Sequence, residues 1–148
     1  LSTIKKQLTP TLLCEFNGCV VGIGTVVYIA KAMGASREVI LSLASKSVTT
    51  PIAMEVTKSI GGIPPLTAAV VVCVGLMCAV CGYRTMGFAR VKSPVAQGLS
   101  MGTAAHAVGT ATAMEKSPVH GAYASLGLTL NVILTSLLTP SIIPLLGV

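Results

Sequence analysis

Charged and aromatic residues are scarce in this sequence. Of its 148 residues only 9% are charged and 3% aromatic, Trp is absent, and 53% are hydrophobic. A soluble globular domain usually has about a quarter charged residues. The composition therefore excludes an ordinary soluble domain and predicts apolar helices packed in a lipid bilayer.

Sequence signals of catalysis are missing as well. There is no phosphate-binding loop, dinucleotide fingerprint or nucleophile–base–orienter set. The five cysteines lie in or beside apolar segments, and His106 and His120 do not complete a metal-ligand spacing. Cys78 and Cys81 form a CxxC pair inside an apolar segment, where small apolar packing is favoured over a redox or metal role. We expect no enzyme, no cofactor and no metal site.

Long uncharged stretches are what the sequence has instead. Residues 63–83 and 121–148 contain no charge, and residues 11–32 contain only Glu15 and Lys31. A bilayer core requires about 20 apolar residues, so we expect spans over 11–32, 63–83 and 121–138, the last ending at Pro140 and Pro144. The start has no cleavable signal pattern. Glu15 and the nearby Asn17 are interpreted as interfacial or helix-packing residues.

The net charge of +6 is placed at the ends of these spans. Lys5 and Lys6 precede the first span, and Arg84, Arg90 and Lys92 follow the third apolar segment. Loops on the cytoplasmic side of membrane proteins carry an excess of Lys and Arg. The charge therefore indicates a membrane-facing cationic rim and no nucleic-acid partner. Gly18, Gly22 and Gly24 predict a small-residue face for helix packing in the first span.

Two further segments are interrupted. Residues 37–59 split at Thr49-Thr50-Pro51, because proline removes a backbone donor and disfavours a helical residue before it. From 95 to 113, 13 of 19 residues are Gly, Ala, Ser or Thr, and glycines 102 and 109 flank His106. We expect two half-helices with a break in each segment. Irregular backbone at membrane depth is tolerated where it is buried or lines a cavity.

A shift of 60 residues aligns the two interrupted segments. Eight of the 23 positions from 44 to 66 are identical after the shift, including Ala53-Met54-Glu55 with Ala113-Met114-Glu115. Each segment either crosses the membrane or forms a re-entrant hairpin. Hairpins place both basic clusters on one side and make the repeat inverted, which is a design of secondary transporters.

The breaks are predicted to hold a small carboxylate. A half-helix that begins inside the membrane points unpaired N–H groups and a positive dipole end at its ligand, and hydroxyl and basic side chains add donors. The predicted substrate-binding residues are Lys46, Ser47, Thr49, Thr50, Pro51, Thr103, His106, Gly109 and Thr110, and the predicted coupling residues are His106, Glu55 and Glu115.

Each of these residues has a structural alternative. The threonines can bond back to the helix backbone, Pro51 can be a packing kink, and Lys46 can extend to the interface. Glu55 and Glu115 stand at half-helix ends, where an interfacial position is the alternative. Function is favoured for His106, because an ionisable residue inside a membrane is a functional candidate by default.

The two interrupted segments resemble the signature regions of the LrgB/CidB family. These are SKSVTTPIAMEVTKSIGGIPPLTA and MGTAAHAVGTATAMEKSPVHGAYASLGL, and TSLLTPSIIPLL resembles the family's C-terminal span. Ser45-Lys46-Ser47 departs from the Pro-Lys-Ser of many members, which affects the expected bend before the first break. Family members have further N-terminal spans, so the chain is expected to be a C-terminal part.

The resemblance implies two functions. Members are described as holin-like or antiholin-like partners of small LrgA/CidA-type membrane proteins that affect murein hydrolase activity and cell lysis. Members are also described as transporters of pyruvate or, in plastids, of glycolate and glycerate. We expect proton- or ion-coupled monocarboxylate transport, with the lysis regulator as the alternative, in a homo-oligomer of the bacterial cytoplasmic (inner) membrane.

The expected fold is an all-α polytopic integral membrane protein with two broken or re-entrant helices. Residues 1–148 are expected to form a single membrane domain. Within it the predicted repeat units cover about 37–84 and 95–148, and residues 11–32 form an additional span.

Overall fold

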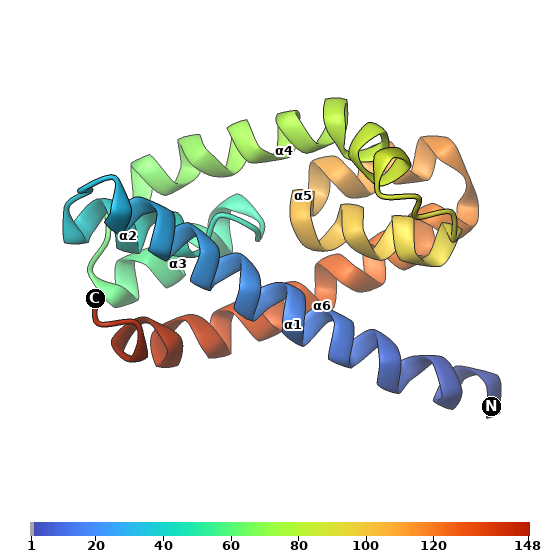
Figure 1. Ribbon diagram of the computed structural model, residues 1–148, viewed down its shortest axis with the longest axis horizontal. Coiled ribbons are helices and arrows are strands. Elements are labelled where there is room, and N and C mark those ends of the chain that lie inside the picture. Colours follow the sequence, from blue (N-terminus) through green and yellow to red (C-terminus); the bar gives the residue numbers. More distant parts are fainter. Residues whose placement is uncertain (1) are drawn as a thin grey trace.

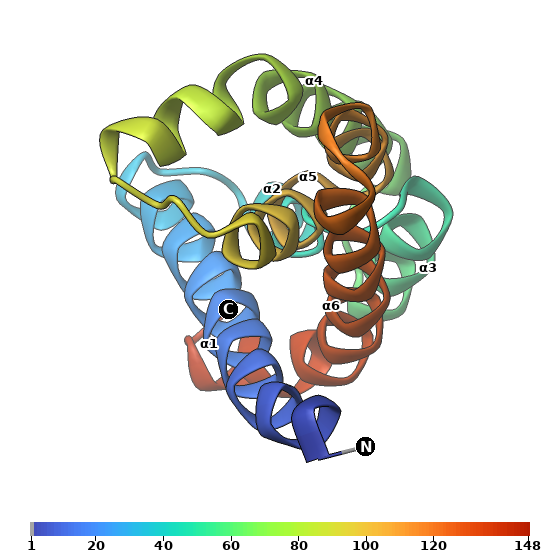
Figure 2. The same cartoon turned by 90° about the vertical axis from the view of Figure 1, so that its right-hand side faces the viewer.

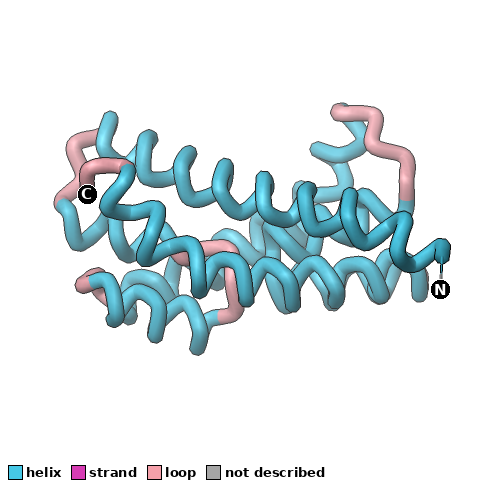
Figure 3. Tube along the Cα trace, turned by 90° about the horizontal axis from the view of Figure 1, so that it is seen from below, coloured by secondary structure: helices cyan, strands magenta, loops and turns pink. Residues whose placement is uncertain are grey.

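The computed structural model describes the backbone of residues 2–148 and the side chains from residue 7 onward. It contains α1 (Ser2–Ala32), α2 (Arg37–Ala44), α3 (Thr50–Ile60), α4 (Pro64–Phe88), α5 (Pro94–Lys116) and α6 (Pro118–Leu145) (Figure 1). No strand occurs within residues 2–148, and irregular backbone lies at the ends of the molecule and between α2 and α3 (Figure 3). The predicted all-α class is confirmed.

Three long helices form the frame. Residues Gln7–Ala32 of α1, and all of α4 and α6, are long and apolar enough to cross a membrane. The Tyr123 hydroxyl donates to Gln7 Oε1 (2.8 Å), and Lys31 Nζ donates to the carbonyl of Leu146 (2.9 Å). These bonds join α1 and α6 at both ends, so the two helices run in the same direction, while α4 runs back (Figure 1).

The segment α2–α3 is a hairpin. Ser45, after the end of α2, donates to the carbonyl of Ala53 (3.1 Å) and is 2.8 Å from the Thr57 hydroxyl. Ser42 on α2 accepts from the N–H of Ile63, beyond the end of α3 (2.7 Å). The two helices are therefore antiparallel, and residues 45–49 form the first break.

The helix α5 is also folded back on itself. His106 has φ 44° and ψ −133°, which are not helical values, and it forms the second break. A Cβ built on Gly109 would lie 2.3 Å from the carbonyl oxygen of Met101, so the two halves are in close contact. The predicted break in residues 95–115 is confirmed at His106.

The two hairpins start at opposite ends of the molecule. The α2–α3 hairpin starts and ends where α4 begins, and the α5 hairpin starts and ends where α4 finishes (Figure 1). Viewed along the long axis, α1, α4 and α6 lie around α2 and α5 (Figure 2). Of the two topologies that the sequence left open, the structure shows segments that return to their own end. The inverted repeat and its unit boundaries stay predictions.

Hairpin topology also places the N-terminal end of α1 at the same end of the molecule as the end of α4 (Figure 1). The predicted basic cluster at Arg84, Arg90 and Lys92 is exposed there. The prediction for Lys5 and Lys6 falls on side chains outside the described ones, so only their place in α1 supports a shared cationic side.

Several predicted boundaries were wrong. The first helix begins at Ser2, well before residue 11, and α4 continues to Phe88. The last helix runs through Pro140 and Pro144 to Leu145. Membrane helices accommodate proline when neighbouring groups satisfy the freed carbonyls. Among the glycines expected to form a packing face, a Cβ added to Gly18 would lie 3.5 Å from the Thr103 methyl group, whereas a Cβ on Gly22 or Gly24 would meet nothing within 4 Å.

Candidate functional site

Asn131 joins the two breaks. This α6 side chain is 1% exposed, and its Nδ2 donates to the carbonyl of Ser47 in the first break (2.7 Å) and to that of Thr103, just before the second (3.0 Å). Its Oδ1 lies 3.3 Å from the Thr135 hydroxyl. One buried amide therefore holds together the inner ends of two hairpins that come from opposite directions.

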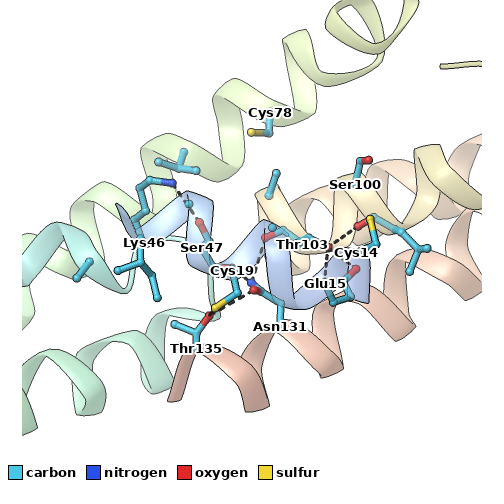
Figure 4. Close-up of a pocket in the computed structure, with 17 residues that line it drawn as sticks. Cys14, Glu15, Cys19, Lys46, Ser47, Cys78, Ser100, Thr103, Asn131 and Thr135 are labelled. Carbon is cyan, nitrogen blue, oxygen red and sulfur yellow. Dashed lines mark hydrogen bonds between the residues drawn. The ribbon is translucent and has the colours of Figure 1, made fainter. Parts of the chain in front are cut away.

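A pocket of about 350 Å³ lies beside this junction, and we call it the central pocket (Figure 4). It is lined by parts of α1, α4, α5 and α6, by the end of α2 and by the first break. Its polar and thiol side chains are those of Cys14, Glu15, Cys19, Lys46, Ser47, Cys78, Ser100, Thr103, Asn131 and Thr135. This volume lies at the small end of the range for ligand pockets.

The basic group of the central pocket is Lys46. It is half-buried in the first break, and its Nζ donates to Ser47 Oγ at 3.1 Å. Figure 4 shows Lys46 and Ser47 on one side of the pocket, with Glu15 and Thr103 on the other. A lysine ammonium has three donors and no acceptor, so further donor capacity is available to a ligand.

The acidic group of the central pocket is Glu15 on α1. It is 1% exposed, and Thr103 Oγ1 lies 2.7 Å from both of its carboxyl oxygens. Of the two alternatives expected for Glu15, a helix-packing or an interfacial residue, the structure supports helix packing, because the residue joins α1 to α5. Asn17 is exposed, and its amide donates to the Leu13 carbonyl of its own helix.

The structure brings together three of the predicted binding residues, which are Lys46, Ser47 and Thr103. Thr49 is the N-cap residue of α3, where it makes no side-chain cap bond, and Thr50 and Pro51 form its first turn. The other predicted binding residues, His106, Gly109 and Thr110, are buried in the α5 hairpin and are not among the described residues that line the central pocket. The binding roles of all nine residues stay predictions.

The predicted coupling residues lie apart from one another. The Nε2–H of His106 donates to the carbonyl of Val71 on α4 (2.9 Å), while Glu55 and Glu115 are exposed. Sequence reasoning missed Asn131 and Thr135, and gave Glu15 no place in the site. Asn131 carried a usable signal, since an amide within an otherwise apolar span is expected to have a buried partner.

The second break is backbone-strained as well as buried. The φ of His106 lies in the left-handed region that favours glycine. His106→Gly and His106→Ala both remove the hydrogen bond to Val71, but only glycine relieves the backbone strain at this positive φ. We expect His106→Gly to be more stable than His106→Ala by about 1 kcal/mol, measured as apparent melting temperature in detergent.

The control for this prediction is Thr112, a regular helical position of α5. There, glycine should be less stable than alanine by about 1 kcal/mol. If the glycine variant at position 106 is no more stable than the alanine variant, the strain argument fails.

Comparison with known proteins identifies the family. The LrgB-like family matches residues 1–145. A Haemophilus influenzae protein named only as uncharacterized is 41% identical over 117 residues, which are 79% of this chain and 51% of the relative. Holin-like protein CidB of Staphylococcus aureus is 32% identical over 140 residues, which are 95% of this chain and 61% of CidB. Antiholin-like protein LrgB of Bacillus mycoides is 35% identical over 144 residues, 97% of this chain and 63% of that protein.

The long apolar helices and these bacterial relatives identify a multi-pass bacterial membrane protein. The chain belongs to the LrgB-like family, as its sequence motifs predicted. It spans between half and two thirds of the length of these curated relatives. No solved structure matches it.

Proposed function

We propose that this chain is a membrane-embedded part of a holin-like or antiholin-like protein that affects murein hydrolase activity and cell lysis. The observation that carries the proposal is the match to relatives named holin-like CidB and antiholin-like LrgB over 95% and 97% of the chain. In this function the protein assembles with a small LrgA/CidA-type membrane protein and takes no catalytic part itself.

The protein has a surface that suits assembly with other membrane proteins. Large apolar side chains stand exposed on each long helix, among them Tyr28 (76%), Val80 (75%) and Leu137 (68%). In a membrane such faces contact lipid, a partner helix or a second copy of the chain. Each of these contacts keeps the apolar side chains away from water. A homo-oligomer and the small partner are both accommodated by three such faces.

A second candidate is transport of a small monocarboxylate such as pyruvate, glycolate or glycerate. The observation that favours it is the central pocket, where Lys46 and Ser47 offer donors at the junction of two hairpins. In this candidate Lys46, Ser47 and Thr103 contact the solute. Thr49, Thr50, Pro51, His106, Gly109 and Thr110 shape the two breaks, and His106, Glu55 and Glu115 keep their predicted coupling role.

One pair of variants tests both candidates. Lys46→Gln removes the cation of the central pocket, and Lys58→Gln removes an exposed cation at the end of α3. A charge-assisted hydrogen bond contributes about 1.5–3 kcal/mol, so Lys46→Gln should lower saturable uptake of pyruvate or glycolate by about tenfold or more. The measurement uses the full-length protein in liposomes, with and without its small partner.

Lysis is measured on the same variants in cells that lack the native protein. Partner-dependent changes in lysis, with uptake no greater than in empty liposomes, would establish the holin-like function and exclude transport. Saturable uptake that is lost in Lys46→Gln and kept in Lys58→Gln would establish transport. Equal uptake by both variants would remove Lys46 from the site.

A further inference from the structure

Glu15 lies in the wall of the central pocket, and no cation pairs with it among the side chains that the structure describes. Among the described side chains, its hydrogen-bond partner is Thr103, while Lys46 bonds to Ser47 on the other side of the pocket (Figure 4). An isolated carboxylate is costly to bury and either pairs with a cation or takes up a proton. Glu15 is therefore expected either to pair with a cation or to be protonated in the pocket.

The hydrogen bonds around Thr103 fit a neutral acid. The single hydroxyl proton of Thr103 has three acceptors at 2.7 Å, namely the carbonyl of Leu99 and both oxygens of Glu15. A protonated Glu15 donates to Thr103 Oγ1, and Thr103 then donates to Leu99, so that every group is satisfied. An ionised Glu15 would compete with Leu99 for that one proton.

The surrounding backbone is built close to this carboxyl group. A Cβ on Gly127 of α6 would lie 3.2 Å from Glu15 Oε1 and 2.9 Å from the carbonyl of Leu99. Glycine at this position lets α6 approach the carboxyl group closely. The same α6 surface presents Asn131 to the two breaks.

Few other titratable groups face Glu15. The pocket wall adds Cys14 and Cys19 from α1, Lys46 from the first break and Cys78 from α4. The residues of α5 and α6 that line it are not titratable, and His106 is bonded to Val71 instead. Glu15 is the one carboxyl group, and Lys46 the one ammonium group, among the described residues that line the pocket.

We propose that Glu15 is the proton-binding residue of the central pocket, and that its proton and a small anion held by Lys46 bind together. This inference rests on the transport candidate above. An ionised Glu15 repels an anion in the same low-dielectric pocket, and protonation removes the repulsion. Because binding free energies are coupled reciprocally, a bound anion raises the proton affinity of Glu15 by the same factor. On release, the proton passes from Glu15 Oε to water entering the pocket and leaves a carboxylate.

The first test is the pH dependence of pyruvate uptake by the full-length protein in liposomes. Where protonation limits binding, wild-type uptake should fall by up to about tenfold per pH unit as the pH rises, because one proton is taken up. Glu15→Gln keeps a donor for Thr103 but cannot titrate, so its uptake should change less than about twofold per unit. Glu38→Gln, at an exposed position of α2, is the matched control and should behave as wild type.

The second test does not depend on transport. The infrared spectrum should contain the C=O band of a neutral carboxyl group that disappears in Glu15→Gln and persists in Glu38→Gln. Gly127→Ala keeps Glu15 but crowds it, so it should shift the band. A wild-type pH profile in Glu15→Gln, or a band unaffected by that change, would overturn the proposal. Loss of the band without uptake by any variant would retain proton binding and exclude transport.

Discussion

Replacement of Asn131 by leucine is expected to loosen the centre of the protein. Leucine has nearly the same branched shape but cannot donate to the carbonyls of Ser47 and Thr103. Side-chain hydrogen bonds between membrane helices contribute on average about 0.6 and at most about 1.7 kcal/mol each. Two lost bonds should therefore lower stability by about 1–3 kcal/mol, seen as a lower melting temperature in detergent.

Asn17→Leu is the matched control, since its amide is exposed and donates only to its own helix. A second readout follows the breaks directly. In a background without the native cysteines, Ser47→Cys should react faster with a water-soluble thiol reagent when Asn131→Leu is added. Equal stability and equal labelling in the Asn131 and Asn17 variants would show that the amide does not hold the breaks together.

The sequence contained enough information for the helices and the breaks. Uncharged runs of about 20 residues predict spanning helices, and Pro51 and the small residues around His106 predict interruptions. These are local signals, and α4, α6 and the second break are found where they indicated. The first break lies slightly earlier than predicted, at residues 45–49, because Thr50 and Pro51 already belong to the first turn of α3. The helix ends were less predictable, because α6 continues through two prolines whose effect depends on neighbouring groups.

The site was less accessible to sequence reasoning, because it depends on which helices meet. Nothing local indicates that Glu15 faces Thr103, 88 positions away, or that Asn131 bonds Ser47, 84 positions away. The prediction centred on half-helix ends and included Lys46, Ser47 and Thr103. The side chains that close the pocket from α1 and α6 enter only through tertiary packing, which a single sequence does not specify.

The contact between α5 and α6 leads to the second large prediction. A Cβ added to Gly102 would lie 2.0 Å from the carbonyl oxygen of Ala124 and 2.9 Å from the N of Leu128. These are backbone atoms, so no rotamer change can relieve the overlap. We expect Gly102→Ala to separate the first half of α5 from α6 and to destabilise the protein by about 3 kcal/mol, the upper part of the range for overpacking.

The same substitution at Gly24 should not destabilise the protein. Position 24 is also helical, but an added Cβ there meets nothing within 4 Å. Alanine is favoured over glycine in a helix by up to about 1 kcal/mol, so Gly24→Ala should be neutral or stabilising. Melting temperature in detergent measures both variants. If Gly102→Ala were as stable as Gly24→Ala, α5 and α6 would not be in backbone contact, and Thr103 would not be held against Glu15 and Asn131 by that packing.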